Sequence, residues 1–298
     1  MVEREHVEFL AESVMLRGFF YPASDVKGPA PAVVMAHGFA GTKEMGLEEY
    51  AECFQRNGLS VLIYDHRNTG ESEGSPRFDL DPVAQWRDYS HAVSYMQLRD
   101  DVDENRIGAW GTSYSGGSVI AAAALDRRIK CIVSQVPLIS GYENILQLMP
   151  LQELDGVIAM LNEDKLSRAK GNAPTMMPIC GREGDPCIFP GERTYDYYHQ
   201  QAQKNPNVQW ENLVTLRSLE YVLEYDVSSY LSRVSPTPAL MIVASEDRST
   251  PSDLALRAYE KMLQPKDLLL VQGDHYRSYI EEFDTTSHAA CDWFVNHL

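Results

Sequence analysis

Short apolar runs alternate with longer segments of helical periodicity along most of the chain. The predicted strands are mostly apolar, as expected for strands buried on both faces of a parallel sheet; they are residues 32–36, 60–64, 107–110 and 129–134. The predicted helices lie between them, at 42–57, 82–99 and 115–125. This alternation predicts an α/β fold with a mostly parallel central sheet and helices on both faces.

The two ends of the chain extend the same pattern. Residues 7–10 and 14–21 predict an opening hairpin. Near the other end, strands are expected at 239–244 and 268–271, and helices at 252–263 and 284–297. These segments would complete the sheet and its helical layers.

Between residues 137 and 235 the alternation breaks, and methionine, proline and aromatic residues become frequent. This predicts a cap inserted at 137–235 into a core made of 1–136 and 236–298. Cap side chains of this kind can line a flexible apolar pocket, but they can equally form the core of the cap itself. The candidates for substrate contact are Met176, Met177 and Tyr198.

Composition narrows the classes of partner. The 298 residues are 44% hydrophobic and 23% charged, as in ordinary globular proteins. A formal net charge of −17 would repel phosphate backbones and anionic lipid headgroups. Neither nucleic acid nor a membrane is therefore expected as a partner, and no apolar run reaches membrane-span length. A neutral or apolar small molecule is the expected ligand.

The chain starts without the basic and apolar segments of a secretory signal, so a cytoplasmic location is expected. The final residues 296–298, Asn-His-Leu, resemble the peroxisomal address only loosely. Five cysteines without metal-ligand spacing suit free thiols in a reducing compartment.

No glycine-rich phosphate loop and no zinc-type histidine pair is present in the sequence, so no cofactor is expected.

The sharpest chemical signal lies where a predicted strand ends and a helix begins. Residues 110–117 read Trp-Gly-Thr-Ser-Tyr-Ser-Gly-Gly. They resemble the nucleophile elbow of the α/β-hydrolases, in which small residues flank a serine two positions away on either side. Here Gly111 and Ser115 flank Ser113, and Ser115 departs from the usual glycine. Because serine is also small, Ser113 is the expected nucleophile, and Ser115→Gly is expected to retain activity.

The resemblance also implies partners for this serine, in the chain order serine, acid, histidine. His275 follows the last predicted strand and is the expected general base. Asp247 follows the preceding strand and is the expected carboxylate, with Glu246 as its competitor. Some members of the superfamily take the acid after an earlier strand, but the loop 135–141 contains no carboxylate.

Two further loops resemble those of the superfamily. The loop 37–41 follows the first central strand, and the backbone N–H groups of Phe39 and Tyr114 are the expected oxyanion donors. The loop 65–74 resembles a D-x-R-G-x-G-x-S segment and is expected to be structural, forming the floor near the site.

Short motifs in the last third of the chain are similar to those of a narrower fungal group, the polyketide transferases and hydrolases of secondary-metabolite clusters. They lie at 217–220, 235–238, 250–251, 260–266 and 275–279. One difference is Asp274, where a glycine commonly precedes the histidine. The resemblance implies cleavage of an ester or thioester of an apolar acyl substrate through an acyl-serine. Acyl transfer to an alcohol or amine, carbon–carbon bond hydrolysis, peptidase action and a non-catalytic ligand-binding role remain alternatives.

Overall fold

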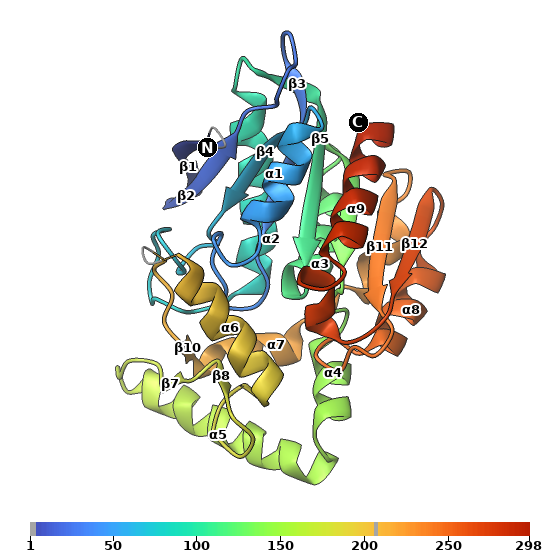
Figure 1. Cartoon of the computed structure of the whole chain (residues 1–298). Coiled ribbons are helices and arrows are strands. Elements are labelled where there is room, and N and C mark those ends of the chain that lie inside the picture. Colours follow the sequence, from blue (N-terminus) through green and yellow to red (C-terminus); the bar gives the residue numbers. More distant parts are fainter. Residues whose placement is uncertain (1–3, 206–207) are drawn as a thin grey trace.

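A computed structural model describes residues 4–205 and 208–298. Its centre is an eight-stranded sheet in the order β1-β2-β4-β3-β5-β6-β11-β12 (Figure 1). β1 and β2 form an antiparallel hairpin, β2 pairs antiparallel with β4, and the remaining pairs are parallel. The strands are β1 (Glu5–Ala11), β2 (Val14–Tyr21), β3 (Ala30–Ala36), β4 (Ser60–Tyr64), β5 (Val102–Thr112), β6 (Ile129–Gln135), β11 (Ala239–Ala244) and β12 (Lys266–Val271).

Helices cover both faces of this sheet. One layer holds α1 (Glu48–Arg56) and α9 (Phe283–His297), and the other holds α2 (Pro82–Gln97), α3 (Tyr114–Leu125) and α8 (Ser252–Lys261). Alternate residues of β3 separate accordingly, with Val33 and Met35 in one apolar core and Val34 in the other. Because both faces of the strand are buried, its sequence is apolar throughout, as predicted.

The predicted strands and helices of the core are present, but several boundaries differ. The strand predicted at 107–110 is the end of the longer β5. The helix predicted from residue 42 begins only at Glu48, because residues 42–47 form a tight turn instead. Lys43 directs this turn inward, with its N–H bonded to Asp65 and its side chain fully buried.

The inserted segment, residues 137–235, lies between β6 and β11 and contributes no strand to the central sheet among its described residues. It contains α4 (Gly141–Leu148), α5 (Leu151–Ala169), α6 (Glu192–Lys204), α7 (Leu216–Glu224) and the 3-10 helix η1 (Ser228–Arg233). Two short ladders pair β7 (Met176–Met177) with β10 (Val214–Thr215) and β8 (Cys180–Gly181) with β9 (Phe189–Pro190). Figure 1 shows α5, α6 and α7 gathered beneath one end of the sheet.

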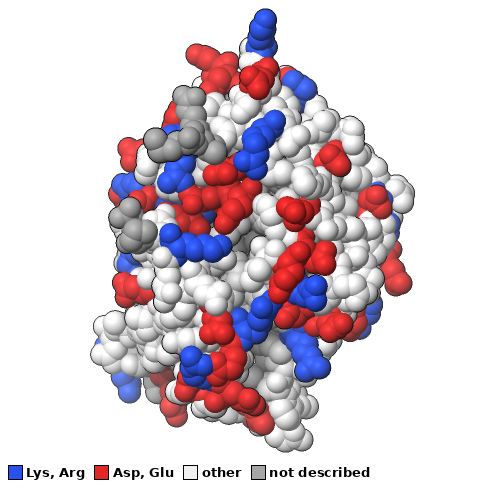
Figure 2. Space-filling model, in the orientation of Figure 1, with Lys and Arg blue, Asp and Glu red and all other residues white. Residues whose placement is uncertain are grey.

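Acidic and basic side chains are interspersed on the face of the molecule seen in Figure 2. This face therefore lacks the continuous basic surface that binds nucleic acid or anionic lipid. In the part of the chain that the structure describes, no helix has both the length and the apolar character needed to cross a bilayer.

Candidate active site

Ser113 occupies the turn between β5 and α3 with a strained backbone. Its φ of 57° and ψ of −120° lie in a region that residues with a side chain rarely adopt. The turn brings α3 back against β5 so closely that a Cβ on Gly111 would lie 2.1 Å from the carbonyl oxygen of Ser115. Glycine is therefore required at position 111. The strained turn leaves the side chain of Ser113 half-buried at the end of the strand.

Three side chains from different strand ends form one hydrogen-bonded chain. Ser113 follows β5, Asp247 follows β11, and His275 follows β12 at the start of the 3-10 helix η2 (His275–Tyr279). Nε2 of His275 lies 3.1 Å from Oγ of Ser113, and Nδ1 lies 2.7 Å from Oδ2 of Asp247. The carboxyl ends of parallel strands meet at one edge of a sheet, so residues far apart in sequence converge here.

The carboxylate of Asp247 is itself held in place. The backbone N–H of Thr250 donates to Oδ1 at 2.8 Å, which leaves Oδ2 to the histidine. The hydroxyl of Thr250 lies 3.0 Å from that Oδ2 and 2.9 Å from the carbonyl oxygen of Val136. Glu246, the alternative acid, is exposed, whereas Asp247 is buried. The structure thus brings Asp247 to the histidine.

The loop 37–41 passes directly against the serine. A Cβ on Gly38 would lie 3.2 Å from Cβ of Ser113, so the absence of a side chain allows this approach. Phe39 is buried beside Tyr114, with the two rings in an edge-to-face contact at 5.5 Å. Tyr114 is the first residue of α3, where backbone N–H groups have no partner within the helix. Both expected oxyanion residues therefore flank Ser113.

Ser115 joins this loop to the elbow. Its side chain is fully buried, and its hydroxyl lies 2.5 Å from the carbonyl oxygen of His37 and 3.0 Å from Nε2 of His66. Since the hydroxyl has one proton and a carbonyl oxygen can only accept, it donates to the His37 carbonyl and accepts from the Nε2–H of His66. The small size of this residue is apparent from the sequence, but these contacts are not, because they join segments 49 and 78 positions apart.

The three residues predicted to contact substrate occupy two different places. The Tyr198 hydroxyl donates to the carbonyl oxygen of Phe39 at 2.7 Å, beside the serine. Met176 and Met177 form β7, which pairs with β10, and Met176 is 40% exposed. Contact of these residues with a substrate stays a prediction.

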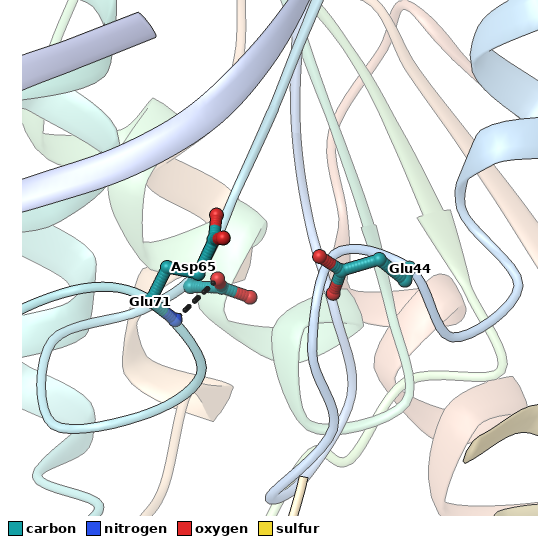
Figure 3. Close-up of side chains that lie close together, drawn as sticks. All are labelled: Glu44, Asp65 and Glu71. Carbon is teal, nitrogen blue, oxygen red and sulfur yellow. Dashed lines mark hydrogen bonds between the residues drawn. The ribbon is translucent and has the colours of Figure 1, made fainter. Parts of the chain in front are cut away.

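Among the residues that the structure describes, one group has the composition of a cation site. It consists of the neighbouring carboxylates of Glu44, Asp65 and Glu71 (Figure 3). Nζ of Lys43 lies 2.8 Å from an oxygen of each. Burial acts to lower the pKa of Lys43, but Asp65 and Glu44 outweigh it, so the pKa stays above its usual value. The charged ammonium thus provides the positive charge of this cluster, which fastens residues 42–47 to the loop 65–74.

Comparisons with known proteins place the chain in a family. The family model for X-Pro dipeptidyl-peptidases (S15 family) matches residues 18–277. A thiohydrolase of Eupenicillium brefeldianum is 32% identical over 279 residues, which cover 92% of this chain and 87% of the relative. Polyketide transferase grgF of a Penicillium species is 30% identical over 297 residues, which cover 99% of this chain and 97% of the relative.

A solved structure agrees with these relatives over the whole length. The crystal structure of the alpha/beta hydrolase GrgF from Penicillium sp. sh18 superposes with a TM-score of 0.84 at 27% identity, covering 99% of each chain. The α/β-hydrolase fold and the resemblance to the fungal group are therefore both confirmed. The chain belongs to the X-Pro dipeptidyl-peptidase (S15) family of α/β-hydrolases, within which its relatives include fungal thiohydrolases and polyketide transferases.

Proposed function

We propose that this protein is a serine-dependent acyl hydrolase that cleaves an ester or thioester through an acyl-Ser113 intermediate. The observation that carries the proposal is the chain Ser113–His275–Asp247, with hydrogen-bond distances of 3.1 and 2.7 Å at a strained elbow. A serine hydroxyl is a weak nucleophile at neutral pH and needs an oriented base within this reach.

The proposed reaction proceeds in two halves. Oγ of Ser113 attacks the acyl carbon while Nε2 of His275 takes its proton, and Asp247 stabilises the resulting imidazolium. The carbonyl oxygen becomes an oxyanion, which the N–H groups of Phe39 and Tyr114 would bind. The tetrahedral intermediate collapses, and His275 gives its proton to the departing thiolate or alkoxide. Water then attacks the acyl-serine by the reverse sequence and releases the acid.

The proposed substrate is an apolar acyl group carried as a thioester or ester. Three features support this class. Relatives are named thiohydrolases and polyketide transferases. The formal net charge of −17 disfavours polyanionic ligands. Aromatic side chains lie beside the histidine: the Tyr276 and Tyr279 rings of η2 are 5.2 and 5.8 Å from the His275 ring, and Tyr197 of the inserted segment packs on Tyr276.

We further propose that the inserted segment acts as a cap over the serine. Its residue Phe189 packs edge-to-face on Phe39 at 5.3 Å, and Tyr198 bonds to the same loop residue. A covered site excludes water from the acyl-serine, which strengthens the oxyanion contacts. Exclusion of water also allows a bound alcohol or amine to compete for the acyl group. Acyl transfer is therefore the second reaction that this site supports.

Thiol release from a panel of acyl thioesters tests the proposal, with and without an added alcohol or amine. Hydrolysis predicts thiol and free acid in equal amounts, whereas transfer predicts an acyl ester or amide in place of the acid. Both activities should be lost in Ser113→Ala. Activity that survives this substitution would contradict the mechanism. Ligand binding without any turnover of the wild-type protein would instead favour a non-catalytic binding protein on the same fold.

A further inference from the structure

Two aromatic side chains of the inserted segment donate hydrogen bonds to consecutive carbonyl groups of the loop 37–41. The Tyr198 hydroxyl donates to the carbonyl oxygen of Phe39 at 2.7 Å, and Nε1 of Trp210 donates to that of Ala40 at 3.1 Å. We propose that Tyr198 and Trp210 are positioning residues, which hold the oxyanion loop in its working shape from the cap side. The inference rests on the proposed function, since it assigns a purpose to the loop beside Ser113.

The argument begins with the geometry of the peptide unit. The carbonyl of one residue and the N–H of the next lie in a single plane, so fixing one fixes the other. The expected donor, the N–H of Phe39, shares a plane with the carbonyl of Gly38. That carbonyl oxygen lies 2.8 Å from Nδ1 of His37 and accepts the N–H of Gly41 at 3.3 Å. Contacts within the loop itself thus fix the plane before Phe39.

The inserted segment fixes the plane after Phe39. Because Tyr198 bonds to the carbonyl oxygen of Phe39, it restrains the rotation between the two planes at this residue. An oxyanion contact depends on donors held about 2.7–3.1 Å from where the charge develops, and a small rotation loses it. Removing this bond should therefore reduce the stabilisation of the transition state more than the binding of the substrate.

The next residue, Ala40, has a strained backbone that other contacts must stabilise. Ala40 has a φ of 51°, a left-handed conformation that alanine rarely adopts. Such strain persists only where the surroundings hold the backbone firmly. The Trp210 bond to the Ala40 carbonyl provides a restraint at this position. The strained loop is thus held at two consecutive carbonyls by the inserted segment.

The two donors are suited to a fixed role. Their rings stack with centroids 5.8 Å apart and an interplanar angle of 25°, and Tyr198 is buried. Burial raises the pKa of Tyr198 well above its usual value, so its hydroxyl stays protonated and remains a donor at every working pH. The indole N–H of Trp210 can only donate. Both bonds therefore persist without any change of protonation.

Tyr198→Phe tests the inference, because it removes the hydroxyl and keeps the ring. Tyr195→Phe is the matched control: Tyr195 lies on the same helix with its ring stacked on His199, and among the described residues its hydroxyl makes no hydrogen bond to the loop. We expect kcat for thioester cleavage to fall by about tenfold or more in Tyr198→Phe, with KM changed by less than about twofold. Tyr195→Phe should match the wild type. The pH dependence of kcat/KM should have the same shape in both variants as in the wild type, because neither substitution touches the Ser113–His275–Asp247 chain.

The rate at which a fluorophosphonate labels Ser113 supplies a second measurement, since the adduct is tetrahedral and places an oxygen at the oxyanion position. Slower labelling of Tyr198→Phe at an unchanged thermal midpoint would support the inference. Labelling and kcat at the wild-type values would overturn it. If the wild type is not labelled at all, the proposed function fails instead. Should Tyr198→Phe not fold, Trp210→Phe decides by the same two measurements, with loss of rate supporting the inference and wild-type rates overturning it.

Discussion

At the scale of single residues, Ser113 and His275 are the positions on which the proposed mechanism depends most. Ser113 accepts a rarely adopted backbone conformation, and its Oγ lies 3.1 Å from Nε2 of His275. We expect Ser113→Ala and His275→Ala each to lower turnover by about a thousandfold or more, because members of such a triad act as a unit. Circular dichroism and thermal melting should show intact folds. Near-normal turnover in either folded variant would remove the assignment.

The two neighbouring acids give a second comparison at this scale. Asp247→Asn should cost more activity than Glu246→Gln, because an amide beside Nδ1 favours the wrong tautomer of His275. Asp247 is buried and bonded to the histidine, whereas Glu246 is exposed. Steady-state kinetics of both variants measure the difference. The reverse order of the two losses would move the orienting role to Glu246.

Ser115 is where the structure changes an expectation drawn from the sequence. Size alone suggests that Ser115→Gly retains activity, but the hydroxyl also contacts the His37 carbonyl and the His66 ring. We now expect kcat to fall by about tenfold, which corresponds to the loss of about one buried hydrogen bond from the loop. Fluorophosphonate should still label the variant at Ser113. Complete loss of labelling in a folded variant would identify Ser115 as the nucleophile.

The residues of the proposed triad could be selected from the sequence because each follows a recognisable strand in a fixed chain order. The supporting contacts could not be selected in this way. Tyr198 and Phe39 lie 159 positions apart, and Trp210 and Ala40 lie 170 apart. No local pattern marks such pairs, since they form only when the inserted segment packs on the core. Thr250 was recognisable as part of a motif, but its bonds to Asp247 were not.

At the scale of elements, the turn at residues 42–47 illustrates how tertiary contacts override local propensity. The sequence there suits a helix, yet the helix begins only at Glu48. The buried ammonium of Lys43 among three carboxylates holds these residues in a turn. Charge pairing at long range therefore decides the boundary, and sequence periodicity could not reveal it.

Removing the positive charge from this cluster should destabilise the protein strongly. Lys43→Met leaves three neighbouring carboxylates without their central partner, at a cost of about 3–5 kcal/mol in the free energy of unfolding. Urea denaturation measures the change, and Lys27→Met, on an exposed loop, is the control. A chelator should leave the stability of the wild type unchanged. Strong destabilisation by the chelator would show instead that a metal ion holds the carboxylates.

The sheet and its covering helices were predictable because short apolar strands alternate regularly with longer helical segments along the chain. The inserted segment was predictable only as an interruption. Its ladders β7–β10 and β8–β9 are two residues per strand, which is too short for any periodicity to register. Its helices α4 to α7 pack against one another and the core rather than on the sheet, so no alternation of strand and helix marks them in the sequence.

At the scale of the whole molecule, the proposed cap should determine which acyl groups react fastest. If it covers the serine, kcat/KM should rise from acetyl to longer or polycyclic acyl thioesters, because a larger apolar group buries more surface. The gain should shrink in Met176→Ala or Met177→Ala if these side chains contact the acyl chain. A series of acyl thioesters measures both effects. A steady preference for acetyl would contradict the polyketide-type substrate and leave a general small-ester hydrolase.

The central claim is that the acyl group passes through Ser113. The most direct measurement is rapid-quench mass spectrometry of the intact protein with an acyl thioester, followed by peptide mapping of the modified residue. The account predicts a transient mass increase equal to the acyl group, located on Ser113 and absent from Ser113→Ala. An acyl group mapped to any other residue, or full turnover without an adduct and undiminished in Ser113→Ala, would contradict it.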